Sequence, residues 1–460
     1  MKKNMDITDS LLDLIGNTPI LKIKSLDTGP CDLYVKLESN NPGGSIKDRI
    51  GLSIIEEAEK SGELKPGGTI IEATAGNTGI GLALIAALKG YKIILVIPDK
   101  MSREKILHLE GLGAEIVLTR SDVPEGHPEY YQDLARKILS ETPGAFLANQ
   151  FSNPANPLAH RTTTAPEIWE QMQGNLDAVV AGVGSGGTLT GLAEYFKAQD
   201  PNITMVAADP EGSVVADAIL KGEYSYEGGS WLVEGVGEDF IPNNFDLSLM
   251  DDAETVSDKE AFDVLQVLLK EEGILGGSST GTLVAAAAKW CRKQKDHKKV
   301  VTFICDTGNK YLSKAYNKSW LQDNNLLDFE SHNDLRDMIN RRADKGEMVT
   351  VSPTDSLLVA YNRMRASDIS QIPVLKDNQL LGVLDEEDLL FSVSKDPSKF
   401  SNEVSHHMIV KLDTLQFDDS EEELLKILSQ GKVAIIYNKD RFLGFITKVD
   451  LLNHYRNKLN

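Results

Sequence analysis

Short apolar runs alternate with longer segments of helical period from about residue 69 to residue 210, and this alternation leaves few folds open to the chain. Runs rich in β-branched residues predict strands at 69–72, 92–97, 177–181 and 203–208. Residues 79–88 are almost wholly apolar, as in a helix buried against a sheet, and Gly90 follows as a stop. The pattern predicts an α/β domain with a largely parallel sheet.

The 460 residues correspond to roughly three packing units of about 150 residues each. Hydrophobic residues make up 41% and charged residues 25%, which is typical of soluble globular domains and excludes disorder over most of the length. The sequence has no apolar run of about 18 residues, and residues 1–6 are not followed by the apolar core of a signal peptide. We therefore expect a cytoplasmic protein.

The charge balance favours small-molecule chemistry. Lys and Arg number 48 against 69 Asp and Glu, a net charge of −21 that would repel nucleic acid and anionic membranes, so we expect neither as a partner. Cys31, Cys291 and Cys305 are scattered and odd in number, which predicts neither a disulfide framework nor a thiolate metal site. We expect buried, reduced thiols and no metal.

The character of the sequence changes after residue 306, which indicates a second domain. Residues 318–347 are charged and amide-rich and lack the apolar alternation of a central strand, so the interdomain linker is expected there. An internal repeat of roughly sixty residues follows. At one constant offset, Val374-Leu375, Gly382 and Asp388-Leu389-Leu390 recur as Ile436-Tyr437, Gly444 and Asp450-Leu451-Leu452. Each copy predicts helix, strand, turn, strand and helix, and the two copies should pack as one paired domain from about 343 to 457.

A lysine near the start of a predicted helix is the first candidate for chemistry. In residues 39–49, adjacent glycines allow close backbone approach, and Ser45 is a candidate cap that places Lys47 in the first turn of a helix running to Ser61. The positive end of the helix dipole disfavours the ammonium form and makes a nucleophilic amine easier to reach. Such an amine suits a Schiff base, although a solvated lysine at a helix start is the plainer alternative.

A glycine-rich loop at 182–188 follows one predicted strand and precedes a helix, an arrangement suited to holding a phosphate. Gly182, Gly184 and Gly187 also fit G-x-G-x-x-G, with Asp209 at the end of the next strand, so a nicotinamide dehydrogenase is a competing interpretation. A tight turn that binds nothing is a third.

Two further turns distinguish the cofactors. The loop at 74–79 offers hydroxyls, an amide and N–H groups to a carboxylate, and the turn at 276–281 offers hydroxyls to a ring nitrogen. A dehydrogenase would leave the lysine segment and the amide loop unexplained. A pyridoxal phosphate site needs a lysine, a loop that binds the phosphate, groups that bind the substrate carboxylate and a partner for the ring nitrogen. The sequence has a candidate for each.

Residues 41–49, 75–79, 184–188 and 14–19 together resemble the fold-type II pyridoxal phosphate enzymes that synthesise cysteine and cystathionine. The resemblance covers about residues 8 to 320, and the tail repeat resembles a CBS-domain pair, or Bateman module. It implies a tryptophan synthase β-like catalytic domain of two α/β subdomains at 1–325, a linker at 326–342, and CBS domains at 343–398 and 399–460.

The resemblance implies a role for each matching residue. Lys47 would form the Schiff base, Asn77 would bond the ring 3′-oxygen, Ser279 would face the pyridine nitrogen, and the phosphate would rest on Gly184, Ser185, Gly186, Gly187 and Thr188. The substrate would be bound by Thr74, Ala75, Asn77, Thr78, Gln150, Gly237 and Glu238.

The implied reaction is β-replacement in transsulfuration: serine or O-acetylserine loses its β-group, and the thiol of L-homocysteine adds to give L-cystathionine. With sulfide the product is cysteine, so an O-acetylserine-dependent cysteine synthase is an alternative, and a nucleotide-sensing scaffold is another. Animal relatives carry tyrosines where this sequence has Phe151 and Glu238. Glu238 could favour the acetylated donor, meet the amino group of homocysteine, or be a solvated loop acid.

The family also suggests further partners. Animal members have an N-terminal haem segment, whereas the resemblance here begins near residue 8, so we expect no haem. A Ser/Thr-x-x-Asp motif in CBS domains holds an adenosyl ribose; Thr447 and Asp450 match it, whereas Asp385 replaces the hydroxyl in the first repeat. We expect at most one site for S-adenosylmethionine or another adenosine derivative, or a module that only assists oligomerisation. A homodimer or higher homo-oligomer is expected.

Overall fold

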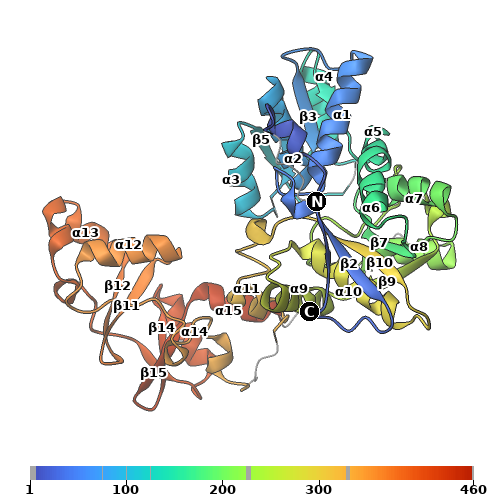
Figure 1. Cartoon of the computed structure of the whole chain (residues 1–460). Coiled ribbons are helices and arrows are strands. Elements are labelled where there is room, and N and C mark those ends of the chain that lie inside the picture. Colours follow the sequence, from blue (N-terminus) through green and yellow to red (C-terminus); the bar gives the residue numbers. More distant parts are fainter. Residues whose placement is uncertain are drawn as a thin grey trace. The chain divides into compact units, whose positions relative to one another are not determined.

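The computed structural model describes residues 7–74, 76–99, 101–124, 126–223, 229–327 and 332–457. The chain forms two compact units, Met1–Asn317 and Lys318–Asn460, and each is described by itself (Figure 1). None of the described helices is both long and apolar enough to cross a membrane.

The N-terminal unit contains two sheets, and in both of them almost all neighbouring strands are parallel. The larger sheet has the order β1 (Ile20–Lys22), β2 (Asp32–Leu37), β10 (Lys299–Ile304), β7 (Ala178–Gly182), β8 (Thr204–Pro210) and β9 (Asp252–Val256), with only β1 antiparallel to its neighbour. The smaller sheet has the order β5 (Glu115–Thr119), β4 (Lys92–Pro98), β3 (Thr69–Ala73) and β6 (Phe146–Leu147). The four strands predicted from the sequence are confirmed as β3, β4, β7 and β8.

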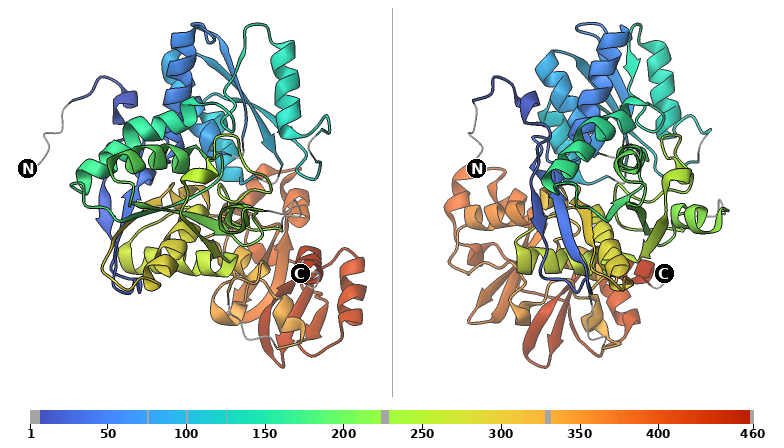
Figure 2. Two further views of the ribbon diagram at one scale, coloured as in Figure 1. Left: turned by 90° about the vertical axis from the view of Figure 1, so that its right-hand side faces the viewer. Right: turned by 45° about the vertical axis from the view of Figure 1, so that its right-hand side comes forward.

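Helices cover both faces of the smaller sheet, because successive strand residues point in opposite directions (Figures 1 and 2). Ile70 packs in one core with side chains of α1 (Lys47–Ser61) and α2 (Asn77–Lys89), whereas its neighbour Ile71 packs with Ala135 of α4 (Tyr131–Glu141) on the other face. The apolar segment 79–88 is confirmed as helix, and α2 ends at Gly90 with φ 76°. Helix α3 (Arg103–Gly111) lies between β4 and β5 in the chain.

The described part of this unit contains further helices. They are α5 (Ala155–Ala159), α6 (Ala165–Gln171), α7 (Gly187–Gln199), α8 (Val215–Lys221), α9 (Asp258–Glu272) and α10 (Ser278–Arg292). Helix α10 is buried along most of its length, since it packs against both α9 and the strands of the sheet.

The predicted internal repeat is confirmed in the C-terminal unit. The first copy contains α12 (Leu357–Ser367), β11 (Gln371–Lys376), β12 (Gln379–Asp385) and α13 (Glu386–Val393). The second contains β13 (Thr414–Gln416), α14 (Glu421–Ser429), β14 (Ala434–Asn438), β15 (Arg441–Ile446) and α15 (Lys448–Asn457). Both hairpins shift register at the same place, between Val374 and Leu375 and between Ile436 and Tyr437.

The domain limits differ from those expected. The units divide after Asn317, and α11 (Lys318–Asp323) already belongs to the second unit. The segment expected as a linker at 326–342 contains Leu335 and Ile339, which are buried in the core of the second repeat. Val404, assigned to the second CBS domain, is instead buried in the core of the first. The few apolar residues of these charged segments complete the cores. The average composition of a segment does not show this role.

Candidate active site

The predicted site residues lie at the carboxyl ends of parallel strands, where loops of both sheets meet. β3 leads into Thr74 and Asn77, β7 leads into the glycine-rich loop, and β10 leads into Cys305 and Asp306. Isolated bridges from Ser45 to Asp306 and from Gly276 to Thr307 bring the lysine loop and the serine-rich turn to the end of β10. Carboxyl ends of strands are the usual location of ligand sites in open α/β sheets.

Lys47 is the first residue of α1, and its surroundings favour a neutral amine. The expected cap is displaced by one residue: Ile46 holds the N-cap position, while Ser45 Oγ accepts the Lys47 N–H at 3.2 Å. Burial lowers the pKa of Lys47 from its ordinary 10.5, although the acidic groups of Cys305, Glu238 and Asp306 act in the opposite direction. The amine is therefore easier to deprotonate than that of a solvated lysine.

The loop at 184–188 is shaped by glycines that nothing larger could replace. A Cβ on Gly184 would lie 2.6 Å from the Gly235 carbonyl oxygen, and one on Gly187 would lie 2.1 Å from Asn156 Oδ1. Gly186 has φ 82°, in the left-handed region. The backbone N–H groups of the first turn of α7 have no partners within the helix, so this loop fits a phosphate.

His160 supports the same loop. Its Nε2 lies 3.2 Å from Thr188 Oγ1, and its Nδ1 lies 2.9 Å from Thr164 Oγ1. Burial, together with the positive charges of Lys47 and Arg49, holds the pKa of this imidazole well below 6.5. The sequence analysis did not single out His160, because a histidine inside a helical segment carries no local signal of its partners.

Asn77 is oriented by two residues that the sequence analysis did not identify. Its Nδ2 donates to Asp306 Oδ2 at 2.7 Å, and its Oδ1 accepts from Lys310 Nζ at 2.9 Å. Asp306 also accepts from the Tyr311 hydroxyl at 2.8 Å. Because an ammonium can only donate and a carboxylate can only accept, these partners fix the orientation of the amide. The position of Asp306 just after an apolar strand was the signal that could have revealed it.

Ser279 lies in the first turn of α10, where it is buried beside Cys305. Burial raises the pKa of that thiol to about 12, although the Ser279 hydroxyl acts in the opposite direction, so the thiol stays neutral. All three cysteines are free; Cys31 and Cys291 are buried as expected, whereas Cys305 is half-buried at the end of β10.

The residues expected to hold the substrate carboxylate lie together. Thr78 Oγ1 donates to Gln150 Oε1 at 2.6 Å, and Thr74 Oγ1 accepts from the Gly76 N–H at 3.3 Å. Ala75 lies outside the described residues.

Gly237 and Glu238 approach the same site from a different loop. The Gly237 N–H donates to the Val183 carbonyl oxygen at 2.8 Å, which ties this loop to the glycine-rich one. The charge of Glu238 contributes to raising the pKa of both Lys47 and Tyr131. Glu238 is a half-buried loop residue, and its role in the site stays a prediction.

The site fits pyridoxal phosphate better than a nicotinamide dinucleotide. It combines a half-buried lysine with a lowered pKa, a cradle of N–H groups, an oriented amide and a buried serine hydroxyl. The acid required by the dinucleotide pattern, Asp209, is fully buried, and its Oδ2 accepts the Ala216 N–H of α8 at 2.8 Å. Its carboxylate therefore accepts a hydrogen bond from the first turn of α8 and is not accessible to a ribose.

The C-terminal unit differs between its repeats at the motif expected to bind a ribose. The Thr447 hydroxyl and N–H donate to Asp450 Oδ2 at 2.6 and 2.7 Å. In the first repeat, Asp385 Oδ1 accepts the Asp388 N–H at 2.7 Å. Burial and the adjacent Asp385 raise the pKa of Asp388 to about 6. The first repeat thus presents two carboxyl groups where the second presents a hydroxyl and a carboxylate.

Comparisons with known proteins match both units. Residues 11–306 match the family model of pyridoxal-phosphate dependent enzymes, and residues 336–395 match that of the CBS domain. The cystathionine beta-synthase of Dictyostelium discoideum is 36% identical over 97% of this chain and 92% of its own length. That of Saccharomyces cerevisiae is 34% identical over 98% of this chain and 99% of its own length.

Solved structures resemble about two thirds of the chain. The O-acetylserine dependent cystathionine beta-synthase from Helicobacter pylori has a TM-score of 0.61 and 40% identity, covering 67% of this chain and 99% of that one. A hydrogen sulfide-producing enzyme from Fusobacterium nucleatum has a TM-score of 0.62 and 40% identity, covering 66% of this chain and all of that one.

Proposed function

The chain belongs to the family of pyridoxal-phosphate dependent enzymes, and from that premise we propose that it condenses L-serine or O-acetyl-L-serine with L-homocysteine to give L-cystathionine. Relatives named cystathionine beta-synthase match it across both units, and this supports both the reaction and regulation through the C-terminal module. The observation that carries the proposal is the half-buried amine of Lys47, whose pKa is lowered, placed among an amide, a serine hydroxyl and a glycine cradle.

The residues of the site would hold the cofactor by complementary chemistry. The loop at 184–188 would bind its phosphate, Asn77 its 3′-oxygen, Ser279 its ring nitrogen and Lys47 its aldehyde carbon. When bound, pyridoxal phosphate supplies a carbonyl for the substrate amine and a ring that withdraws electrons from the α-carbon. A neutral serine at the ring nitrogen leaves that nitrogen unprotonated, which favours β-elimination.

Lys47 would act as the base once the substrate amine has replaced it. Its lowered pKa gives a larger neutral fraction, and the neutral amine removes the proton from the substrate α-carbon. Thr74, Thr78 and Gln150 would orient that carbon by binding the α-carboxylate. Departure of the β-group then leaves the β-carbon open to attack by a thiolate.

The second candidate function is that of an O-acetylserine-dependent cysteine synthase. It differs from the first in its acceptor, which is sulfide in place of homocysteine, and it uses only the acetylated donor. Phe151 and Glu238 favour the acetylated donor, because neither supplies a neutral hydroxyl to a serine leaving group. The likeness to the Helicobacter pylori enzyme, whose name specifies O-acetylserine, points in the same direction.

Product analysis with serine and O-acetylserine crossed against homocysteine and sulfide tests the proposal. Cystathionine formed faster than cysteine at equal thiol concentration supports the main reaction. Cysteine as the dominant product from O-acetylserine and sulfide would replace it with the second candidate, and absence of both products would reject β-replacement.

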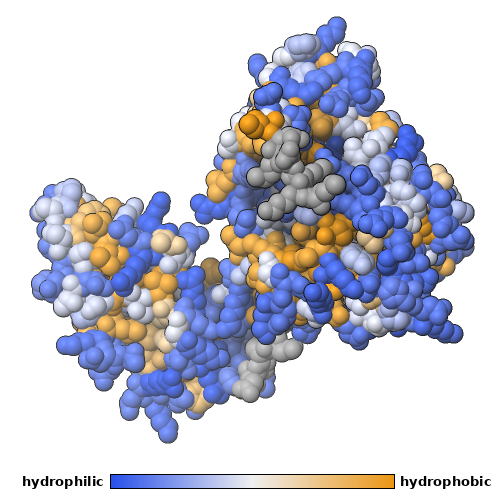
Figure 3. All heavy atoms as spheres, viewed as in Figure 1, coloured by the Kyte–Doolittle hydropathy of each residue, from blue (hydrophilic) through white to orange (hydrophobic). Residues whose placement is uncertain are grey.

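Three other expectations stay predictions. We propose that the enzyme is cytoplasmic, needs no haem and forms a homodimer or higher homo-oligomer. Exposed apolar side chains on the C-terminal unit support association: Leu390 and Phe391 of α13 are 60% and 69% exposed, and Figure 3 shows hydrophobic side chains over α12 and α13. Light scattering measures the mass, and a Soret band in the purified protein would contradict the absence of haem.

A further inference from the structure

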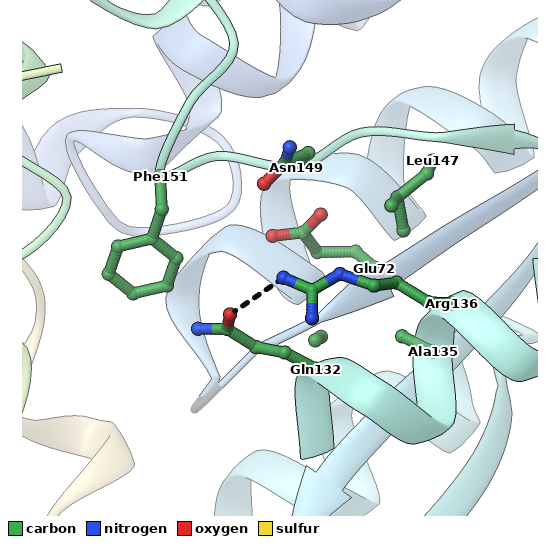
Figure 4. A pocket seen from close by; sticks show the side chains of 8 residues that line it. Glu72, Gln132, Ala135, Arg136, Leu147, Asn149 and Phe151 are labelled. Carbon is green, nitrogen blue, oxygen red and sulfur yellow. Dashed lines mark hydrogen bonds between the residues drawn. The ribbon is translucent and has the colours of Figure 1, made fainter. Parts of the chain in front are cut away.

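A small hollow that is open to solvent lies beside the substrate-carboxylate loop (Figure 4). Glu72 and Ala73 of β3, Leu147 of β6, and Gln132, Ala135 and Arg136 of α4 line it, with Asn149 and Phe151 completing the wall. Of the residues that line this hollow, only Phe151 has been given a role in the donor site above. We propose that it receives the α-carboxylate of the thiol acceptor, an amino acid, with Arg136 as the binding cation.

The hollow shares a wall with the donor site. Gln150 lies between two residues that line the hollow, Asn149 and Phe151, while its own side chain accepts from Thr78 in the carboxylate loop. The Gln150 N–H donates to Glu72 Oε1 at 3.3 Å. One short segment therefore faces the donor on one side and the hollow on the other.

A chain of interactions also connects the hollow with Lys47. Glu238 acts electrostatically on both Lys47 and Tyr131. The Tyr131 hydroxyl accepts from Gln132 Nε2 at 3.0 Å, and Gln132 Oε1 accepts from Arg136 Nη2 at 3.5 Å. These contacts join Arg136 to Tyr131, whose pKa is raised in part by the charge of Glu238.

Arg136 is the cation among the described residues that line the hollow. Its Nη1 pairs with Asp133 at 2.8 Å, but the 3.5 Å contact of Nη2 with Gln132 lies at the limit of a hydrogen bond. The guanidinium turns toward Gln132 in Figure 4. A carboxylate entering the hollow would replace this weak contact with a charge-assisted one.

Glu72 provides a second sign of a ligand. Its side chain is almost completely buried, and its Oε2 has no hydrogen-bond partner among the described residues. Burial raises the pKa of this carboxyl to about 8, so at pH 7 it carries a proton that it can donate. A protonated Glu72 does not repel a carboxylate held at Arg136.

The inference rests on the proposed function and narrows it, because sulfide has no carboxylate and would gain nothing from this subsite. Its test is the steady-state kinetics of the holoenzyme and of Arg136→Gln. We expect KM for L-homocysteine to rise by about 10-fold to 100-fold, the usual effect of losing a hydrogen-bonded charge, with kcat nearly unchanged. KM for sulfide and for the donor should stay within about 2-fold.

Two controls separate this subsite from general electrostatics. Lys137→Gln removes the same charge from the adjacent exposed position of α4, outside the lining, and should leave KM for homocysteine unchanged. 3-Aminopropanethiol, an acceptor without the carboxylate, should react equally with wild type and Arg136→Gln.

An unchanged KM for homocysteine in Arg136→Gln, or an equal rise in Lys137→Gln, would overturn the subsite and leave β-replacement intact. If the wild type formed cysteine from sulfide but no cystathionine, the subsite would fall while the second candidate function stood. Absence of both products would reject the proposed function together with the subsite.

Discussion

At the scale of single residues, burial shifts Lys47 and Glu72 toward neutrality from opposite starting charges. Lys47 loses part of its preference for the ammonium, whereas Glu72 retains its proton. In both cases the low dielectric of the interior disfavours the charged form. The two residues therefore offer direct tests of the electrostatics of the site.

Replacement of Lys47 by Ala should remove both the attachment point of the cofactor and the base. We expect turnover to fall by at least about 10³-fold, as for other essential bases and nucleophiles. Borohydride reduction followed by peptide mass spectrometry should find pyridoxyl at residue 47 in the wild type and none in Lys47→Ala. A pyridoxyl group on a different lysine of the wild type would contradict the assignment.

Replacement of Glu72 by Gln should change how stability depends on pH. The folded pKa of about 8 exceeds the ordinary value of 4.5, so ionisation favours the unfolded chain as pH rises between these values. Relative to Glu72→Gln, the wild type should lose up to about 1.4 kcal/mol per pH unit across that window. Melting temperatures of both proteins at about pH 5 and about pH 8 measure the effect. A constant difference between the two would show that Glu72 titrates normally.

At the scale of secondary-structure elements, the start of α1 depends on side chains from other parts of the chain. The first turn of α1 is held by Arg49, whose guanidinium pairs with Glu38 at 2.7 Å and with Glu167 at 2.8 Å. Glu167 also pairs with Lys36 of β2 at 2.9 Å. This buried network orients the helix that carries Lys47.

Gly187→Ala should disturb the phosphate loop without affecting the rest of the sheet. The added methyl would collide with Asn156 Oδ1, and Asn156 holds Ser185 through a 2.9 Å hydrogen bond. We expect Kd for pyridoxal phosphate to rise at least about 10-fold in a fluorescence titration of the apoenzyme. Gly111→Ala is the matched control, since a Cβ there meets nothing within 4 Å. Equal Kd values for the two variants would argue against the cradle.

At the scale of the whole molecule, catalysis and regulation are assigned to separate units. The division after Asn317 and the independent cores of the two repeats support this separation. The Helicobacter pylori structure aligns over 99% of its length with 67% of this chain.

A protein ending at Asn317 should bind pyridoxal phosphate and retain turnover, while losing any response to S-adenosylmethionine. In the full chain, Asp450→Asn should abolish that response, because Asp450 would accept from the ribose hydroxyls, whereas Asp385→Asn should preserve it. Calorimetry with S-adenosylmethionine measures binding directly. Binding of S-adenosylmethionine that survives Asp450→Asn would show that its site lies elsewhere. A truncated protein unable to bind pyridoxal phosphate would contradict the proposal that the two units are separable.

Local spacing was sufficient to predict the strands, the buried helix, the glycine loop, the position of Lys47 and the tail repeat. Each of these depends on neighbours in the chain: a left-handed glycine, a period of two or 3.6, or a lysine at a helix start. Such requirements are visible wherever the residues are contiguous.

The tertiary structure alone decided which distant residues complete these features. Placement of β10 between β2 and β7 brings Asp306 and Lys310 to Asn77, more than two hundred residues earlier in the chain. The same kind of long-range packing brings Leu335 into the core of the second repeat. No local period encodes the order of strands in a sheet, so these partners follow only from the folded chain.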